Sequence, residues 1–299
     1  RSIVKIALFN DNRIGVVQDN VLMDISELVN WNQREPQKSL VEFMQNFNQL
    51  KKIILNQITE LPSYPINEII LRAPVPSPSK IVAAPINYML HRDEMDEQFR
   101  SSPSTVDKLG FFLKAPSSII GPGETVLLPF KERRTDHEAE IAFVVGREAK
   151  DIPASQASNY IFGYFALMDI TVRGKEDRPW RKSFDTFTPI GPWIVTGDEV
   201  KNPNELQMNL WVNKELRQSA NTNTLIYDCF TFFEAVTKVM TLLPGDIVTT
   251  GTPEGVGAIT KGDTVRIHIE RIGEFSIQVD YKADVDGSNV MKVNHSLTN

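Results

Sequence analysis

The sequence predicts an α+β protein that is rich in strands, with a small N-terminal α+β domain ahead of a larger domain built on a curved or rolled sheet. Beyond residue 80, short apolar segments of strand length recur between turn residues, whereas few segments, foremost residues 230–241, show helical periodicity. Between residues 73 and 80, three prolines stand within five residues. Such a stretch cannot be helix or central strand, so it predicts an extended connector between two domains.

The N-terminal domain is expected over residues 1–73. Turn residues separate its short apolar segments, and helical periodicity follows. Strands are predicted at residues 4–9, 15–18 and 21–24, and helices at 40–47 and 50–61.

The larger domain is expected over residues 74–285, and residues 286–299 read as a tail. A polar segment at residues 87–99 can form a helix. Strands are predicted at residues 81–83, 126–128, 138–145, 161–169, 193–195, 206–212, 247–250, 265–269 and 275–279.

Composition excludes several classes of partner. The formal charge is −6 without a basic cluster, which argues against nucleic acid. No apolar run approaches the roughly 18 residues of a membrane span, and the first residues read as a strand and not as a signal peptide. The one cysteine, Cys229, lies in an apolar stretch, where a packed core thiol is expected, and its lack of a disulfide partner fits a reducing cytoplasm.

Two glutamates one residue apart, Glu138 and Glu140, precede an apolar, partly β-branched run. Residues i and i+2 of a strand face the same side, so two carboxylates would lie together beside a buried segment. Like charges there need a cation, unless the strand lies at a wet edge of the sheet. A third acid, Asp169, ends another apolar run, and three oxygen ligands suit Mg²⁺ or Mn²⁺.

Other residues are candidates for catalysis and binding. His91 and Glu94, three apart on the predicted helix, could form an oriented general base or an incidental pair on a solvated face. Arg173 and Lys182 could neutralise a substrate carboxylate or be surface charges. A glycine-rich loop at residues 251–257 lacks the spacing of known nucleotide-binding loops.

In this order, five motifs resemble the fumarylacetoacetate hydrolase family, over about residues 78–282, with His91 and Glu94 ahead of them. They are Glu138-x-Glu140, the segment from Asp169 to Arg173, the segment at residues 180–185, Leu216-Arg217-Gln218, and the stretch at residues 245–257.

The resemblance implies a mixed β-roll catalytic domain, a homodimer, and Mg²⁺ or Mn²⁺ held by Glu138, Glu140 and Asp169. It implies a hydrolase that cleaves a C–C bond of a 2,4-dioxo acid, of the acylpyruvate, fumarylpyruvate or maleylpyruvate type, through a metal-bound pyruvate enolate in the catabolism of aromatic compounds. Alternatives on the same site are a decarboxylase of oxaloacetate-like 2-oxo acids, a dienoate isomerase or hydratase, and a non-catalytic metal- or ligand-binding homologue.

The hydrolase reading assigns roles to individual residues. His91, oriented by Glu94, would deprotonate water, and Lys182 would add positive charge to the oxygen cluster. Substrate contacts are expected from Arg173, Gly251, Thr252, Tyr88 and Glu176, and residues 87–108 would form a lid. Many hydrolases of the family have glutamine at the position of Glu176, and some larger relatives have an additional metal-site aspartate where this sequence has Ala84.

Overall fold

A large mixed sheet runs through the protein, which we describe from a computed structural model covering residues 5–99 and 102–283. Within these residues the sheet has 12 strands, in the order β4-β3-β2-β1-β14-β12-β11-β17-β6-β7, with β5 beside β1 and β8 beside β14. Its strands are β1 (Lys5–Phe9), β2 (Arg13–Gln18), β3 (Val21–Asp24), β4 (Ser63–Pro65), β5 (Leu71–Arg72), β6 (Ile81–Ala83), β7 (Phe112–Lys114), β8 (Ile119–Ile120), β11 (Ala139–Val145), β12 (Ile161–Met168), β14 (Thr188–Thr196) and β17 (Ile247–Thr249).

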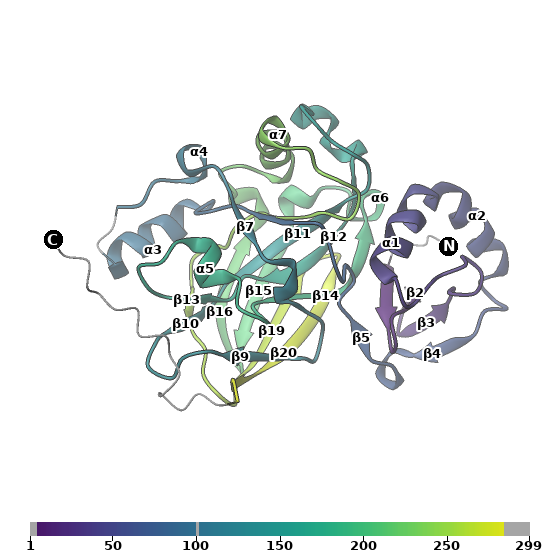
Figure 1. Cartoon of the computed structure of the whole chain (residues 1–299), viewed down its shortest axis with the longest axis horizontal. Helices are drawn as coiled ribbons and strands as arrows, with labels where there is room; N and C mark the ends of the chain where they lie inside the picture. The colour runs from purple at the N-terminus through teal and green to yellow at the C-terminus, as the bar shows by residue number, and fades with distance from the viewer. Residues whose placement is uncertain (1–4, 100–101, 284–299) are drawn as a thin grey trace.

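Two smaller sheets and a set of short helices complete the fold. In Figure 1 the long strands of the five-stranded sheet lie beneath β11 and β12, and α7 lies above them. The smaller sheets contain β10 (Thr135–His137), β13 (Thr171–Val172) and β18 (Gly257–Ala258), and β9 (Thr125–Leu128), β15 (Gln207–Val212), β16 (Glu215–Asn221), β19 (Thr264–Ile269) and β20 (Gly273–Tyr281). The α-helices are α1 (Pro36–Gln45), α2 (Phe47–Gln57), α3 (Met89–Phe99), α4 (Val106–Leu109), α5 (Arg178–Lys182), α6 (Gly197–Val200) and α7 (Cys229–Val239).

The predicted strand-rich α+β class is confirmed, and the central strands show why. Every residue of β11 is buried, because the sheet carries one apolar cluster on each face. The clusters alternate along the strand, with Phe143 in one and Val144 in the other. Cys229 is fully buried in the first cluster, as expected, and burial raises the pKa of its thiol.

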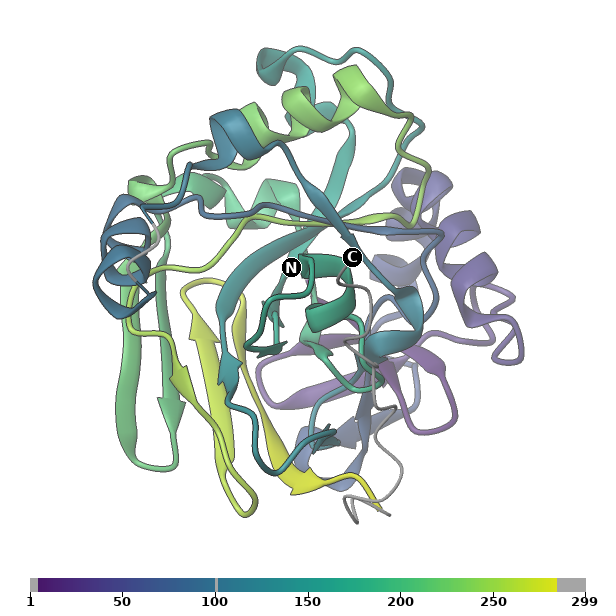
Figure 2. The ribbon, with the colours of Figure 1, turned by 60° about the vertical axis from the view of Figure 1, so that its left-hand side comes forward.

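The N-terminal part of the chain continues the large sheet. Strand β1 pairs antiparallel with β14, and α1 and α2 stand at one side of the molecule in Figures 1 and 2. Phe43 of α1 packs in the same cluster as Phe165 of β12, so both parts share a core. Division of the chain at the proline-rich connector stays a prediction, and the tail at residues 286–299 lies outside the described residues.

The register of three central strands brings the ends of β12 and β17 beside the start of β11. Ala139 pairs with Met168, so β11 begins where antiparallel β12 ends. Ala142 pairs with Thr249, which ends β17 on the other side of β11. Residues that follow β12 and β17 therefore lie beside the residues that open β11.

The strand predicted at residues 138–145 is present but begins one residue later, at Ala139. Glu138 lies between β11 and a further strand, β10, that the sequence did not predict. The two strands belong to different sheets, so the chain crosses between sheets at Glu138. The backbone carbonyl of Glu138 still accepts a hydrogen bond from Asp169 N (2.8 Å), which keeps the two acids adjacent.

None of the helices within residues 5–99 and 102–283 has the length and apolar character required to cross a membrane.

Candidate metal and catalytic site

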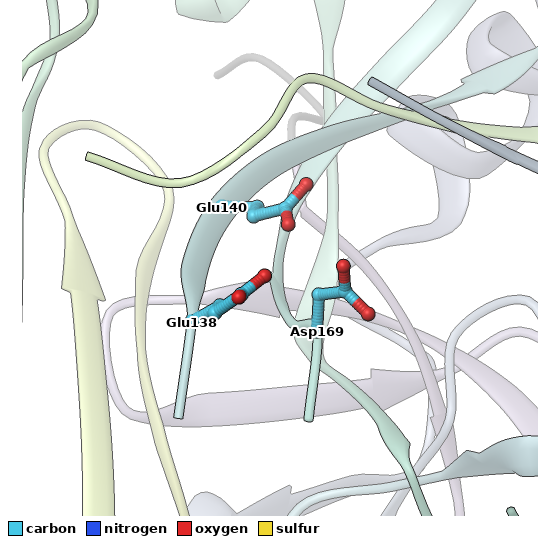
Figure 3. Close-up of side chains that lie close together, drawn as sticks. All are labelled: Glu138, Glu140 and Asp169. Atoms are coloured by element: carbon cyan, nitrogen blue, oxygen red, sulfur yellow. The ribbon is translucent and has the colours of Figure 1, made fainter. Parts of the chain in front are cut away.

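Three buried carboxylates meet where β11 begins. Glu138 precedes β11, Glu140 is its second residue, and Asp169 follows the end of β12. One oxygen of each lies within 4.8 Å of the others, and none of the three residues is more than 5% exposed. Figure 3 shows the two glutamates on one segment and Asp169 on the neighbouring one, with their carboxylates gathered together. The structure thus brings together the three predicted ligands.

Two lysines neutralise part of this negative charge. Lys182 Nζ donates to Glu138 Oε2 (2.7 Å), Asp169 Oδ2 (2.6 Å) and Thr171 Oγ1 (2.7 Å). Lys114 Nζ donates to Asp169 Oδ1 (2.6 Å) and to the carbonyl of Phe187 (2.8 Å). Burial alone would raise the pKa of Glu138, but Lys182, Arg173 and His91 outweigh burial and lower it to about 2.

Glu140 has a different environment. Its Oε1 accepts hydrogen bonds from Thr249 Oγ1 (2.6 Å) and from Gly251 N (2.7 Å). Among the described residues, no lysine or arginine forms an ion pair with Glu140. Burial, and then the charges of Asp169 and Glu138, raise the pKa of Glu140 well above its usual value. A divalent cation would supply the missing positive charge, and an all-oxygen donor set fits Mg²⁺ or Mn²⁺.

His91 and Glu94 form an oriented pair on α3. His91 Nδ1 lies 3.2 Å from Glu94 Oε2, and Glu94 Oε1 accepts a hydrogen bond from Gly255 N (3.0 Å). His91 is only 5% exposed, which removes the alternative of a solvated helix face. It lines a small cavity of about 50 Å³ together with Glu138 and Lys182.

Arg173 also lines this cavity, but protein carboxylates hold its guanidinium. Nε donates to Asp136 Oδ2 (2.7 Å) and Nη2 to Glu138 Oε1 (3.2 Å). This geometry favours support of Glu138 over direct capture of substrate.

Thr252 lines the cavity, and Gln218 positions it. Gln218 Nε2 donates to Thr252 Oγ1 (2.8 Å) and to the carbonyl of Pro253 (3.0 Å), while Oε1 accepts from Ala139 N (2.9 Å). His137 Nδ1 lies 3.0 Å from the same Oε1, so this histidine is packed in the interior. Gly251 adopts φ of 92°, a conformation that suits glycine, and donates its N–H to Glu140.

Three of the expected substrate contacts, Gly251, Tyr88 and Glu176, do not line the cavity. Tyr88 is 1% exposed and does not line the cavity, and its hydroxyl has no hydrogen-bond partner among the described residues. Glu176 instead pairs with Arg133, whose Nη1 and Nη2 donate to its two oxygens (3.0 and 2.8 Å). Because that ion pair directs the Glu176 carboxylate to Arg133, a role in substrate binding has no support from this geometry.

Comparison with known proteins identifies the family of this chain. Residues 80–280 match the family described as "Fumarylacetoacetate (FAA) hydrolase C-terminal". The chain belongs to the fumarylacetoacetate hydrolase family. The match covers every strand and helix that contributes to the carboxylate triad and its lysines.

Several relatives of known name in the fumarylacetoacetate hydrolase family cover nearly the whole chain. A maleylpyruvate hydrolase of Aquipseudomonas alcaligenes is 40% identical over 284 residues, which is 92% of this chain and 99% of that protein. A crystal structure of maleylpyruvate hydrolase from Sphingobium sp. in complex with manganese(II) and pyruvate is 37% identical, with a TM-score of 0.83 over 93% of this chain and 99% of that one. A 2-hydroxyhepta-2,4-diene-1,7-dioate isomerase from Mycobacterium marinum is 29% identical, with a TM-score of 0.72 over 94% and 99% of the two chains.

Proposed function

We propose that this protein is a divalent-metal-dependent hydrolase that cleaves a C–C bond of a 2,4-dioxo acid of the acylpyruvate type, in the breakdown of aromatic compounds. One observation carries the proposal. A buried carboxylate triad that lacks balancing charge at Glu140 lies at a cavity lined by an oriented histidine and a lysine. The Aquipseudomonas and Sphingobium relatives support it, because each is named as a maleylpyruvate hydrolase.

Glu138, Glu140 and Asp169 would hold Mg²⁺ or Mn²⁺, and the bound metal would polarise substrate oxygens and stabilise negative charge on them. The side chains supply the proton transfers. His91 removes a proton from water with Nε2, while Nδ1–H donates to Glu94, which stabilises the imidazolium. The backbone N–H of Gly255 holds the second Glu94 oxygen, which keeps this base in place.

Bond changes follow from that proton transfer. The water oxygen adds to the C4 carbonyl carbon, and the C3–C4 bond then breaks. The electron pair passes to the pyruvate fragment, next to the ammonium group of Lys182. Protonation of C3 by His91 yields pyruvate and a carboxylic acid, which returns the histidine to its neutral form.

A product assay tests this activity. Purified protein is incubated with fumarylpyruvate and with acetylpyruvate, with Mn²⁺ or with EDTA. Equal amounts of pyruvate and the second acid are expected with Mn²⁺ only. The variant His91→Ala should lose about 10²–10⁴-fold in rate while its Mn²⁺ affinity stays near that of the wild type. Normal hydrolysis by this variant would refute the assigned base.

An isomerase is the second candidate, supported by the Mycobacterium marinum relative. The same histidine could move a proton between carbons without adding water. Such an enzyme would shift the ultraviolet absorption of a dienoate substrate and release no pyruvate, so adding a dienoate to this assay separates the two activities.

We also propose a homodimer located in the cytoplasm, with a domain boundary in the connector at residues 73–80. Light scattering coupled to size-exclusion chromatography would report the dimer. Limited proteolysis, followed by mass spectrometry of the fragments, would report cleavage in the connector.

A further inference from the structure

The cavity is lined by more positive charge than the protein itself neutralises. Arg173, Arg178, Arg181 and Lys182 line it, against one lining carboxylate, that of Glu138. Arg173 and Lys182 are both paired with the carboxylate cluster. The remaining two arginines therefore decide the charge that the cavity presents to a ligand.

Neither of these two guanidinium groups has a carboxylate partner within the described residues. Arg178 forms no hydrogen bond or ion pair with another described residue, although it lies close enough for Glu138 and Asp169 to act on it electrostatically. Arg181 donates from Nε to the backbone carbonyl of Glu176 (2.7 Å), which fixes its direction, and its terminal nitrogens pair with no carboxylate of residues 5–99 and 102–283.

Burial makes this arrangement unfavourable without a ligand. Desolvation lowers the pKa of both Arg178 and Arg181, because each guanidinium lies partly out of water near other cations. Cations in such places are normally paired, and an arginine presents a planar fork of donors that matches a carboxylate. The missing counterion is therefore expected to come from the substrate.

The metal that Glu138, Glu140 and Asp169 would hold supplies positive charge for the 1-carboxylate and 2-oxo end of a dioxo acid. We propose that Arg178 and Arg181 bind a second, distal carboxylate, so that the enzyme selects dicarboxylic 2,4-dioxo acids over monocarboxylic acylpyruvates. This inference rests on the proposed function, since it assigns the substrate class of the same site.

A pair of substrates tests the selectivity. Fumarylpyruvate and acetylpyruvate share the bond to be cleaved, and fumarylpyruvate carries –CH=CH–COO⁻ where acetylpyruvate carries a methyl group. Wild-type protein should show kcat/KM at least about 100-fold higher for fumarylpyruvate. Arg178→Gln should lower that value about 10- to 100-fold and change kcat/KM for acetylpyruvate less than about threefold. Arg178→Lys should recover part of the loss, and Arg266→Gln, a surface arginine paired with Glu274, should change neither value.

A binding measurement separates this inference from the proposed reaction. Titration calorimetry on the Mn²⁺-loaded protein compares 2-oxoadipate with 2-oxohexanoate, which have equal chain length and differ in the distal carboxylate. Wild type should bind the dicarboxylate at least about tenfold more tightly, and Arg178→Gln should remove that preference.

If neither dioxo acid is cleaved but the dicarboxylate preference is present and needs Arg178, the hydrolase proposal fails and the carboxylate site stands. Equal losses on both substrates, an unchanged preference in the variant, or no preference in the wild type would overturn the carboxylate site.

Discussion

Replacing Glu140 with glutamine should stabilise the metal-free protein and abolish its response to metal. Glutamine keeps the size of the side chain and an oxygen that accepts hydrogen bonds from Thr249 Oγ1 and Gly251 N. It removes a charge within 4.8 Å of the Glu138 and Asp169 oxygens. At an effective dielectric constant near 20, two unit charges at that distance repel by about 3.5 kcal/mol.

The expected gain is smaller than that repulsion. The two lysines oppose part of it, and the raised pKa of Glu140 allows a proton to relieve part of the rest. We therefore expect the unfolding free energy of Glu140→Gln in EDTA to equal or exceed that of wild type by about 1–2 kcal/mol.

Metal should reverse that ranking. A metal at 100 times its dissociation constant stabilises the folded state by about 2.7 kcal/mol. For 299 residues the entropy of unfolding is about 0.6 kcal/mol/K, so Tm of wild type should rise about 4 °C. Scanning fluorimetry with EDTA or Mn²⁺ measures both effects.

Asp246 provides the matched control. It is fully buried, but it forms an ion pair with Lys80 Nζ (2.6 Å) and accepts a hydrogen bond from Ser79 Oγ (2.5 Å). Because Asp246→Asn breaks an ion pair, it should lower stability by about 2–3 kcal/mol and keep the metal response. If Glu140→Gln behaves like Asp246→Asn in EDTA and still responds to Mn²⁺, the reasoning about an uncompensated carboxylate is wrong.

Three further outcomes are expected. Lys114→Met should destabilise the metal-free protein by about 3 kcal/mol, because Asp169 loses a buried cation. The same variant should bind Mn²⁺ more tightly in calorimetry, and weaker binding would contradict the idea that Lys114 competes with the metal for Asp169. Iodoacetamide at pH 8 should leave Cys229 unmodified in the native protein and modify it in urea, as judged by mass spectrometry, because the thiol is buried and its pKa is raised; native labelling would contradict the packing. Glu176→Gln should change kcat/KM less than about threefold, because its partner Arg133 lies outside the cavity; a tenfold loss would restore Glu176 as a substrate contact.

Part of the site could be predicted from the sequence, because some of its residues can be recognised from their neighbours in the chain. A carboxylate beside a buried apolar run is unusual, and Glu138, Glu140 and Asp169 all have that pattern. The strand-rich class followed in the same way, from short apolar segments between turns.

Other site residues depend on contacts between distant segments. Lys114 bonds to Asp169, 55 residues later, and Gln218 bonds to Ala139, 79 residues earlier. Periodicity within one segment carries no information about such partners. Lys114 did leave a signal, because it follows the apolar residues 111–113 in a short strand, where a lysine needs a counterion.

For a related reason, the sequence did not show that the chain passes from one sheet to another at Glu138. Alternation along a strand describes side-chain direction only while the strand stays in one sheet. Here β10 joins β13 and β18, and β11 joins the large sheet. Which sheet each strand enters depends on partners in other segments, such as Val172 for β10 and Thr249 for β11.

The hydrogen bonds that hold Glu140 have a consequence for the order of folding. Thr249 and Gly251 follow Glu140 by 109 and 111 residues, and β17, which carries Thr249, also pairs in parallel with β6, 166 residues before it. Contacts this distant in sequence form slowly, because a long loop must close before they yield any stabilisation. The carboxylate triad is therefore assembled only after most of the chain has condensed, and Mn²⁺ cannot act as an early nucleus. Metal concentration should accordingly slow unfolding strongly while leaving the rate of refolding nearly unchanged.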